Sequence, residues 1–416
     1  MSGSPQLLLG PYRVLDLTGG DVLLCGKILA DLGADVLQVE PPGGSASRRT
    51  GPFYGDVPHP DRSLLWWAYC AGKRSVTLDL DSVDGRGIFT RLVESADFLI
   101  ESFCPGHMAE LGLAHPDLER VNPSLVMVSV TDFGQEGPYS GYKATDIVDM
   151  ALGGFMHLTG DADRPPLTVG CPQARRHGAA AGAMGALVAH THRALTGQGQ
   201  HVDVSCQQAV AKALAHAPQS WDMEGLVIQR MGVYRQTSED TRVRVNWPCK
   251  DGHINYMLQG GSVAWSTRNL LQWMREEGSG APDLEGVPWE ELGYGQVTEE
   301  LMDRAAGPLG DFFRRHTREE LTTGSVERRI LLFPVATYGD LLEHPQLEAR
   351  DYFVEMDHPE LGRWVTHPGG FVKAEGVATG PRRRPPLVGE HNHEVYVGEL
   401  GLALEEMAVL REGGVI

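Results

Sequence analysis

The most constraining feature of this sequence is a repeated alternation of short apolar strands and helix-forming segments near its start. Residues 12–17 have a strand pattern, residues 21–32 have the apolar spacing of a helix that ends at Gly33, and residues 34–40 form a second strand pattern. A strand, a helix and a strand within about 30 residues make a parallel βαβ unit. The alternation continues to residue 130, so we expect an α/β domain with a mostly parallel sheet.

Three later segments differ in character. Residues 178–195 have a helical pattern so rich in Ala and Gly that we expect another element to pack very close to it. Between residues 220 and 335 the chain has more Trp, acidic helical segments and Gly-rich connections, which favours a smaller α+β domain. Residues 379–393 are rich in Pro and Arg and predict an extended strap on the surface.

The charge of the chain limits its partners. It has 36 Lys and Arg residues against 55 Asp and Glu residues, a formal net charge of −19. This argues against a nucleic acid or an anionic membrane as partner. The first residues lack the pattern of a secretory signal, and no apolar run approaches about 18 residues, so we expect a cytoplasmic protein. Six scattered cysteines without a Cys-x-x-Cys pair are interpreted as reduced thiols.

One long stretch contains no carboxylate. From Arg164 to Val202 there is no Asp or Glu, although the chain as a whole is acidic. The stretch includes His190 and His192, whose spacing of two residues puts them on different faces of a helix. We therefore expect no metal site there, and no metal cofactor.

Short motifs spread along the whole chain resemble the class III CoA-transferases, the superfamily of formyl-CoA transferase, carnitine CoA-transferase and α-methylacyl-CoA racemase. Each motif is weak alone, but their order is specific. They lie at residues 15–18, 29–42, 72–80, 101–106, 122–126, 133–139, 196–205, 333–335 and 386–391.

The resemblance implies a fold and a substrate class. It implies a Rossmann-like large domain that binds CoA, which we assign to residues 1–215, and a small α+β domain at residues 216–335. Residues 336–416 would then be a C-terminal segment that returns to the large domain, and two chains would interlock as a dimer. Coenzyme A would be present as an acyl-CoA substrate.

The resemblance also implies a catalytic aspartate that this chain lacks. In the family that aspartate is acylated to a mixed anhydride and then carries CoA as a thioester. Its position is best matched by Arg175, and the His-Asp pair of the racemases is matched by Thr145 and Asp146. Some class III enzymes have two different subunits of which one carries the aspartate, a pattern that the benzylsuccinate enzyme resembles. We therefore expect a non-catalytic subunit paired with an Asp-bearing homologue, exchanging CoA between a donor such as succinyl-CoA and an organic acid, aromatic acids included.

Five residues are candidates for binding CoA. Lys73 and Arg74 precede a strand where the resemblance implies the adenosine-phosphate end of CoA, and both cations suit phosphate oxygens. Phe103 would cover the adenine, Lys143 matches a position that contacts CoA in the family, and Arg48 follows a Pro-Pro-Gly-Gly loop from which it could reach phosphate. The ordinary alternatives are a solvated basic turn and a core phenylalanine.

Three further residues are candidates for chemistry or substrate binding. Asp146 is the best catalytic candidate if the chain works alone, although an Asp before an apolar run is more often a helix cap. Gln173 and His177 lie one helical turn apart and could donate hydrogen bonds to a substrate carboxylate, or be structural. Two alternatives stay open: a homodimeric transferase or racemase with a non-standard catalytic residue, and an inactive CoA-binding regulatory protein.

Overall fold

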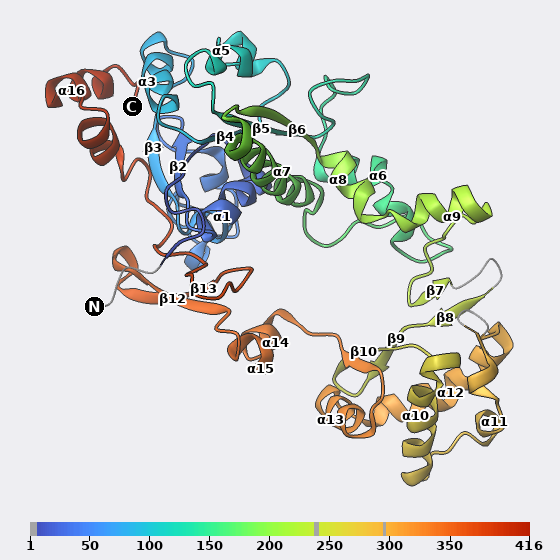
Figure 1. Ribbon diagram of the computed structural model, residues 1–416. Coiled ribbons are helices and arrows are strands. Elements are labelled where there is room, and N and C mark those ends of the chain that lie inside the picture. Colours follow the sequence, from blue (N-terminus) through green and yellow to red (C-terminus); the bar gives the residue numbers. More distant parts are fainter. Residues whose placement is uncertain (1–5, 237–240, 294–296) are drawn as a thin grey trace. The chain divides into compact units, whose positions relative to one another are not determined.

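The chain forms two compact units in a computed structural model that describes residues 6–236, 241–293 and 297–416. The first unit combines the described residues up to Gly153 with Gly170–Ala213 and His344–Ile416. The second combines Gly154–Val169 with the described residues of Leu214–Glu343. Figure 1 shows the elements of each unit. The three domain ranges expected from the sequence stay a prediction.

A six-stranded sheet forms the centre of the first unit. Its order is β3-β2-β1-β4-β5-β6, and every neighbouring pair is parallel. This is the Rossmann order, in which the chain starts in the middle and builds outward to both sides. The strands are β1 Arg13–Asp16, β2 Asp35–Glu40, β3 Arg74–Thr77, β4 Phe98–Glu101, β5 Val126–Thr131 and β6 Gln200–Ser205.

Helices cover both faces of this sheet. On one face, α1 (Leu24–Asp31) and α7 (Ala174–Thr196) bury alanines and Cys25 against the valines of the strands. On the other face, α3 (Val83–Val93) packs Phe89 and its neighbours against alternate strand residues. All six residues of β5 are buried, as expected for a parallel strand covered on both sides.

The Ala- and Gly-rich helix does pack very close to its neighbours. A Cβ atom on Gly178 would lie 2.5 Å from the Cys206 sulfur, and one on Gly182 would lie 3.0 Å from a Val130 methyl. A Cβ atom at Gly178 would therefore force a shift of α7 or its neighbours, and one at Gly182 would make a tight contact with Val130.

The C-terminal segment belongs to the same unit as the six-stranded sheet and packs against it. The Tyr396 hydroxyl donates to the Thr77 carbonyl at 2.7 Å, and Ile416 is buried in the core beside α3. The strap that the sequence predicts at 379–393 has little regular structure and leads to this docked end. Further elements of the unit are α2 Leu64–Cys70, α4 His107–Glu110, α5 His115–Glu119, α6 Asp146–Leu152, α8 Cys206–Ala213, α15 Pro345–Glu348, β12 Phe353–His358, β13 Arg363–Pro368 and α16 Leu404–Glu412.

The second unit is a smaller α+β structure with its own core. An antiparallel sheet, β11-β10-β9, shares a core with helices of the same unit, and this core includes Trp247, Phe312 and Phe313. Its elements are α9 His216–Glu224, β7 Tyr234–Gln236, β8 Arg242–Arg244, β9 Asn246–Cys249, β10 Gly252–Tyr256, α10 Ala264–Glu276, α11 Pro282–Glu285, α12 Glu299–Arg315, α13 Arg318–Arg328, β11 Leu332–Pro334 and α14 Tyr338–Leu342.

The predicted fold class is thus confirmed: a mostly parallel Rossmann-like sheet with a smaller α+β unit. Interlocking of two chains stays a prediction. Among the residues that the structure describes, no helix has the length and apolar character needed to cross a bilayer.

Candidate functional site

Two adjoining hollows lie at the carboxyl ends of the parallel strands. In folds with this strand order, ligands bind at that edge, where the chain switches from one half of the sheet to the other between β1 and β4. Gly19 after β1 and Ser102 and Phe103 after β4 line both hollows and so form their common wall. The sequence places turns and loops at this edge because every β–α connection of a parallel sheet starts there.

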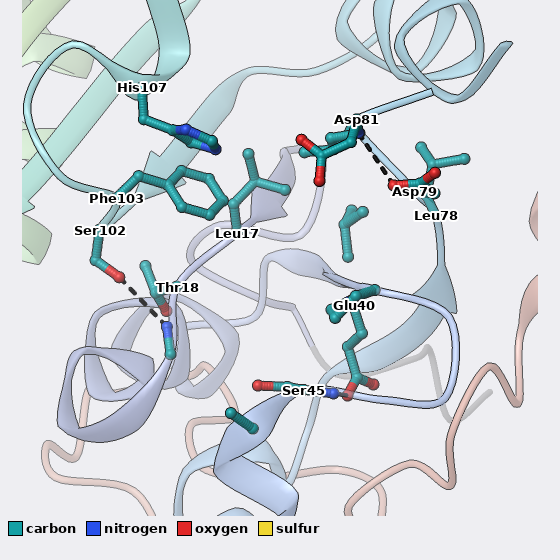
Figure 2. A pocket seen from close by; sticks show the side chains of 15 residues that line it. Leu17, Thr18, Glu40, Ser45, Leu78, Asp79, Asp81, Ser102, Phe103 and His107 are labelled. Atoms are coloured by element: carbon teal, nitrogen blue, oxygen red, sulfur yellow. Dashed lines mark hydrogen bonds between the residues drawn. The ribbon is translucent and has the colours of Figure 1, made fainter. Parts of the chain in front are cut away.

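The first hollow, which we call the Asp79 hollow, has a volume of about 340 Å³. Figure 2 shows Phe103 and His107 on one side and Asp79 and Asp81 on the other. The Phe103 and His107 ring centroids are 4.8 Å apart. The wall thus offers an aromatic face opposite carboxylate acceptors, which suits a polar ring with N–H or O–H donors better than a phosphate.

The second hollow, which we call the Arg175 hollow, has a volume of about 440 Å³. Asp132 reaches it from the residue directly after β5, Arg175 from the first turn of α7, and Lys143 from the loop before α6. Arg175 Nε and Nη2 donate to the two Asp132 carboxylate oxygens at 3.0 and 3.1 Å, and Nη2 also donates to the Ala144 carbonyl at 3.3 Å. A bidentate pair of this kind fixes the guanidinium in orientation.

Asp146 lies beside this pair but caps a helix. One of its carboxylate oxygens accepts hydrogen bonds from the backbone N–H groups of Gln173 and Ala174, each at 2.7 Å. The first N–H groups of a helix have no partner within it, so Asp146 satisfies two donors at the start of α7. The sequence suggested a cap for the helix that follows Asp146; the helix capped is instead α7.

Asp149 is the most unusual group near the hollow. It is fully buried on α6, and no N–H or O–H group of the described residues donates to either of its oxygens. Burial, and then the negative charge of the neighbouring Asp132, raise the pKa of Asp149 to about 7, while Arg175 opposes this rise. The neutral form of Asp149 is therefore favoured below about pH 7.

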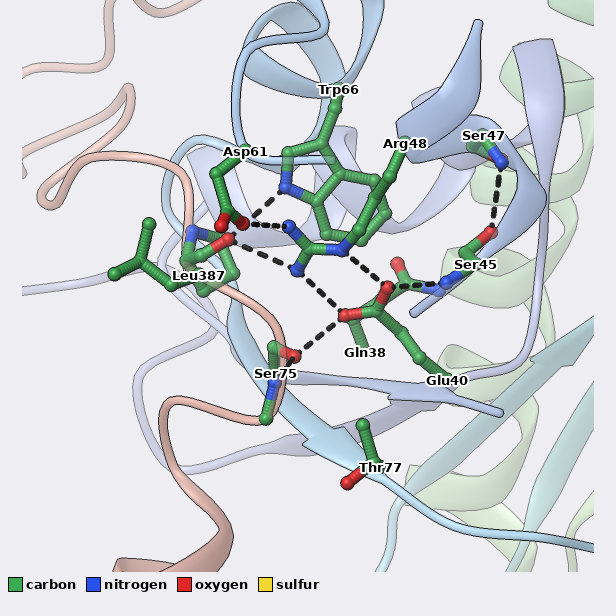
Figure 3. A network of polar contacts seen from close by, with 12 residues as sticks. Gln38, Glu40, Ser45, Ser47, Arg48, Asp61, Trp66, Ser75, Thr77 and Leu387 are labelled. Atoms are coloured by element: carbon green, nitrogen blue, oxygen red, sulfur yellow. Dashed lines mark hydrogen bonds and ion pairs between the residues drawn. The ribbon is translucent and has the colours of Figure 1, made fainter. Parts of the chain in front are cut away.

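Arg48, a predicted CoA contact, is the centre of a buried polar network. Figure 3 shows its guanidinium between Glu40 and Asp61, with the Trp66 indole beside it. The Arg48 nitrogens lie 2.6 and 2.7 Å from the Glu40 oxygens and 2.9 Å from Asp61, and the side chain has no exposed surface. Arg48 also donates to the carbonyl of Pro386, so it fastens the C-terminal strap.

Lys73 and Arg74 are likewise buried in ion pairs. Lys73 Nζ lies 2.8 Å from Asp16 and has no exposed surface. Arg74 donates to Asp35 at 2.9 Å and to Glu399 at 2.6 Å. Neither residue, nor Arg48, lines either hollow. All three therefore brace the sheet, and Arg48 and Arg74 also hold the C-terminal segment. A contact with CoA phosphate would require them to give up these partners.

The two other polar candidates make local contacts. Gln173 Nε2 lies 3.0 Å from the Cys171 sulfur, and His177 Nδ1 donates to the Gln173 carbonyl at 2.8 Å. Neither lines one of the two hollows. Their contact with a substrate stays a prediction, whereas Phe103 and Lys143 do lie in the hollow walls.

Sequence reasoning missed Asp132 and Asp149. Asp132 had a usable signal, since it directly follows a mostly apolar strand whose end faces the ligand-binding edge. Asp149 had a weaker one, an acid within the otherwise apolar run 147–152. Within the described ranges, no group of three or more His, Cys, Asp or Glu side chains is arranged to hold a metal ion.

Comparison with known proteins gives a consistent result. Residues 9–392 match the sequence profile of CoA-transferase family III. The chain is 36% identical over 409 residues, 97% of each protein, to the succinyl-CoA:(R)-benzylsuccinate CoA-transferase subunit BbsE of Thauera aromatica. It is 30% identical over the whole of both chains to the succinyl-CoA–D-citramalate CoA-transferase of Chloroflexus aurantiacus.

The fold has a close counterpart among solved structures. The crystal structure of a CaiB/BaiF family protein from Brucella suis matches 95% of this chain and 100% of its own, with a TM-score of 0.81 and 25% identity. Together with the strand order and the end-to-end sequence match, this places the chain: it belongs to CoA-transferase family III.

Proposed function

We propose that this chain is the subunit of a two-component CoA-transferase that forms part of the substrate site but does not supply the nucleophile. The observation that carries the proposal is the carboxylate-free stretch 164–202, which includes the start of α7 at the Arg175 hollow. A nucleophilic carboxylate must be free to attack a thioester. At the position where the family resemblance implies that group, this chain has a guanidinium.

The acids nearest to the hollow are poorly suited to replace it. Among the described residues, Asp132 is the only carboxylate in the wall of the Arg175 hollow, and both its oxygens accept from Arg175. Asp146 accepts two backbone hydrogen bonds. Asp149 is buried and lies outside the wall. This favours an Asp-bearing homologue as partner over a homodimer that uses Asp146.

The two hollows are our candidate for the CoA thioester site. Phe103 in their common wall would cover the adenine, and Lys143 would contact the cofactor from the Arg175 hollow. We assign Arg48, Lys73 and Arg74 a supporting role behind these walls, because each is buried against carboxylates.

The names of the relatives suggest the substrates. One is named as a subunit, and two are named as using succinyl-CoA. We infer a succinyl-CoA-type donor and an organic acid acceptor, aromatic acids included. The Asp-bearing partner would be a homologue of this chain, with the two interlocked in a cytoplasmic complex.

A transfer assay tests the proposal. CoA transfer from succinyl-CoA to a panel of organic acids is measured for this chain alone and for the complex isolated with its native partner. We expect transfer by the complex only, and we expect Asp146→Asn in this chain to leave it intact, because Asn can still cap α7. Turnover by the chain alone that disappears in Asp146→Asn would establish the homodimeric alternative. Binding of CoA without turnover in any combination would establish the inactive CoA-binding protein.

A further inference from the structure

Arg175 is held in place by Asp132 yet keeps donors for a ligand. Its side chain is 39% exposed and lines the hollow. Nε and Nη2 donate to Asp132 and Ala144, whereas Nη1 has no acceptor among the described residues. Arg175 therefore keeps Nη1 free of acceptors from the described residues, on a side chain that lines the hollow.

The charges around Arg175 leave the hollow able to accept one more anion. The negative charge of Asp132 balances the positive charge of the Arg175 guanidinium. The titratable and charged groups next to Asp149 are Asp132, Asp146, Arg175 and Cys206. Asp149 lies outside the wall, and burial raises its pKa to about 7, so it does not place a full second negative charge beside Arg175 near neutral pH. Lys143, exposed in the same wall, has no carboxylate partner in the described part of the chain. Of the described cations in the wall, Arg175 is paired with Asp132, whereas Lys143 has no ion pair.

We propose that Arg175 Nη1 and Lys143 Nζ form a subsite for the free carboxylate of a dicarboxylic acyl group, so that this chain selects acyl-CoA substrates that carry a second acid. The inference rests on the proposed function, because it assumes that a CoA thioester enters the hollow. A singly charged carboxylate suits the site better than a phosphate, because Asp132 in the same wall repels a doubly charged group more strongly. The planar guanidinium also matches carboxylate geometry.

The test compares two ligands that differ only in that carboxylate. The probes are the non-cleavable analogues of succinyl-CoA and butyryl-CoA in which a methylene group replaces the sulfur, with CoA as a third ligand. Their dissociation constants are measured by calorimetry on the complex isolated with its native partner. The variants are Lys143→Met, an exposed position, and the double variant Arg175→Gln with Asp132→Asn, which removes the ion pair without leaving a single charge.

We expect the intact complex to bind the succinyl analogue more tightly than the butyryl analogue. Each variant should reduce the preference for the succinyl over the butyryl analogue by about tenfold, as for one charged hydrogen bond lost. The double variant, which changes no residue assigned to CoA binding, should also leave the butyryl analogue and CoA within about twofold. Equal affinity of the intact complex for both analogues would overturn the inference. An equal loss of affinity for all three ligands in the variants would also overturn it and would indicate a contact with CoA phosphate. If CoA binds and only this preference is missing, the proposed function stands. If none of the ligands binds, both fail.

Discussion

At the scale of single residues, the structure raises the pKa of Asp149, which the sequence shows as an ordinary acid. Asp149 has a folded-state pKa near 7 against an ordinary value of 3.8, because burial and the Asp132 charge oppose its ionisation. At low pH the group is neutral in both the folded and the unfolded chain. As the pH rises from about 4 to about 7 the unfolded chain ionises first, so the free energy of unfolding falls.

Asp149→Asn should remove this loss of stability. We expect the variant to be more stable than the natural chain by about 1–3 kcal/mol at pH 8, with a clearly smaller gain at pH 5. Urea unfolding at the two pH values measures this. Asp163→Asn in an exposed turn is the control and should be neutral at both. The same gain at both pH values would show that Asp149 does not titrate between them.

Residue partners were also the least predictable part of the site. Lys73 and Arg74 look like a basic turn in the sequence, but their counter-ions include Asp16, 57 residues away, and Glu399, 325 residues away. Local patterns contain no information on pairs at such separations. The ion pairs that bury these two cations therefore become visible only in the folded chain, and their contact with CoA phosphate stays a prediction.

At the scale of elements, the sequence was informative. The strand expected at residues 34–40 is β2 at Asp35–Glu40, and the helix expected at 178–195 lies within α7 at Ala174–Thr196. Apolar runs and helix stops are local signals. The strands of a parallel sheet are easy to recognise because they are buried on both faces and are therefore nearly continuous apolar runs. The start of α7 was harder to place, because Asp146, 27 residues from Gln173, caps it.

The close approach of α7 to the sheet yields a paired prediction. Gly178→Ala should destabilise the chain by about 1–3 kcal/mol, since the added Cβ would lie 2.5 Å from the Cys206 sulfur. Gly87→Ala in α3 meets no atom within 4 Å and should stabilise by about 0.5–1 kcal/mol through helix propensity. Both are read from urea or thermal unfolding. Similar effects of the two substitutions would mean that α7 can move away from the sheet.

At the scale of the whole molecule, the C-terminal segment ties distant parts of the chain together. Arg48 holds the Pro386 carbonyl, and Tyr396 and Ile416 complete the core beside α3. The sequence predicted a strap from its Pro and Arg content, but it could not show which residues the strap would meet. Family resemblance supplied the enzyme class, whereas the missing carboxylate at the start of α7 raised the question of a partner.

The central claim is that this chain works beside a homologue that carries the nucleophile. The most direct test is the native mass of the complex isolated from its own source, with every chain identified by mass spectrometry. We predict two different homologous chains, the second with an aspartate at the position equivalent to Arg175, and loss of CoA transfer when that aspartate becomes asparagine. A transferase composed of this chain only would contradict the claim.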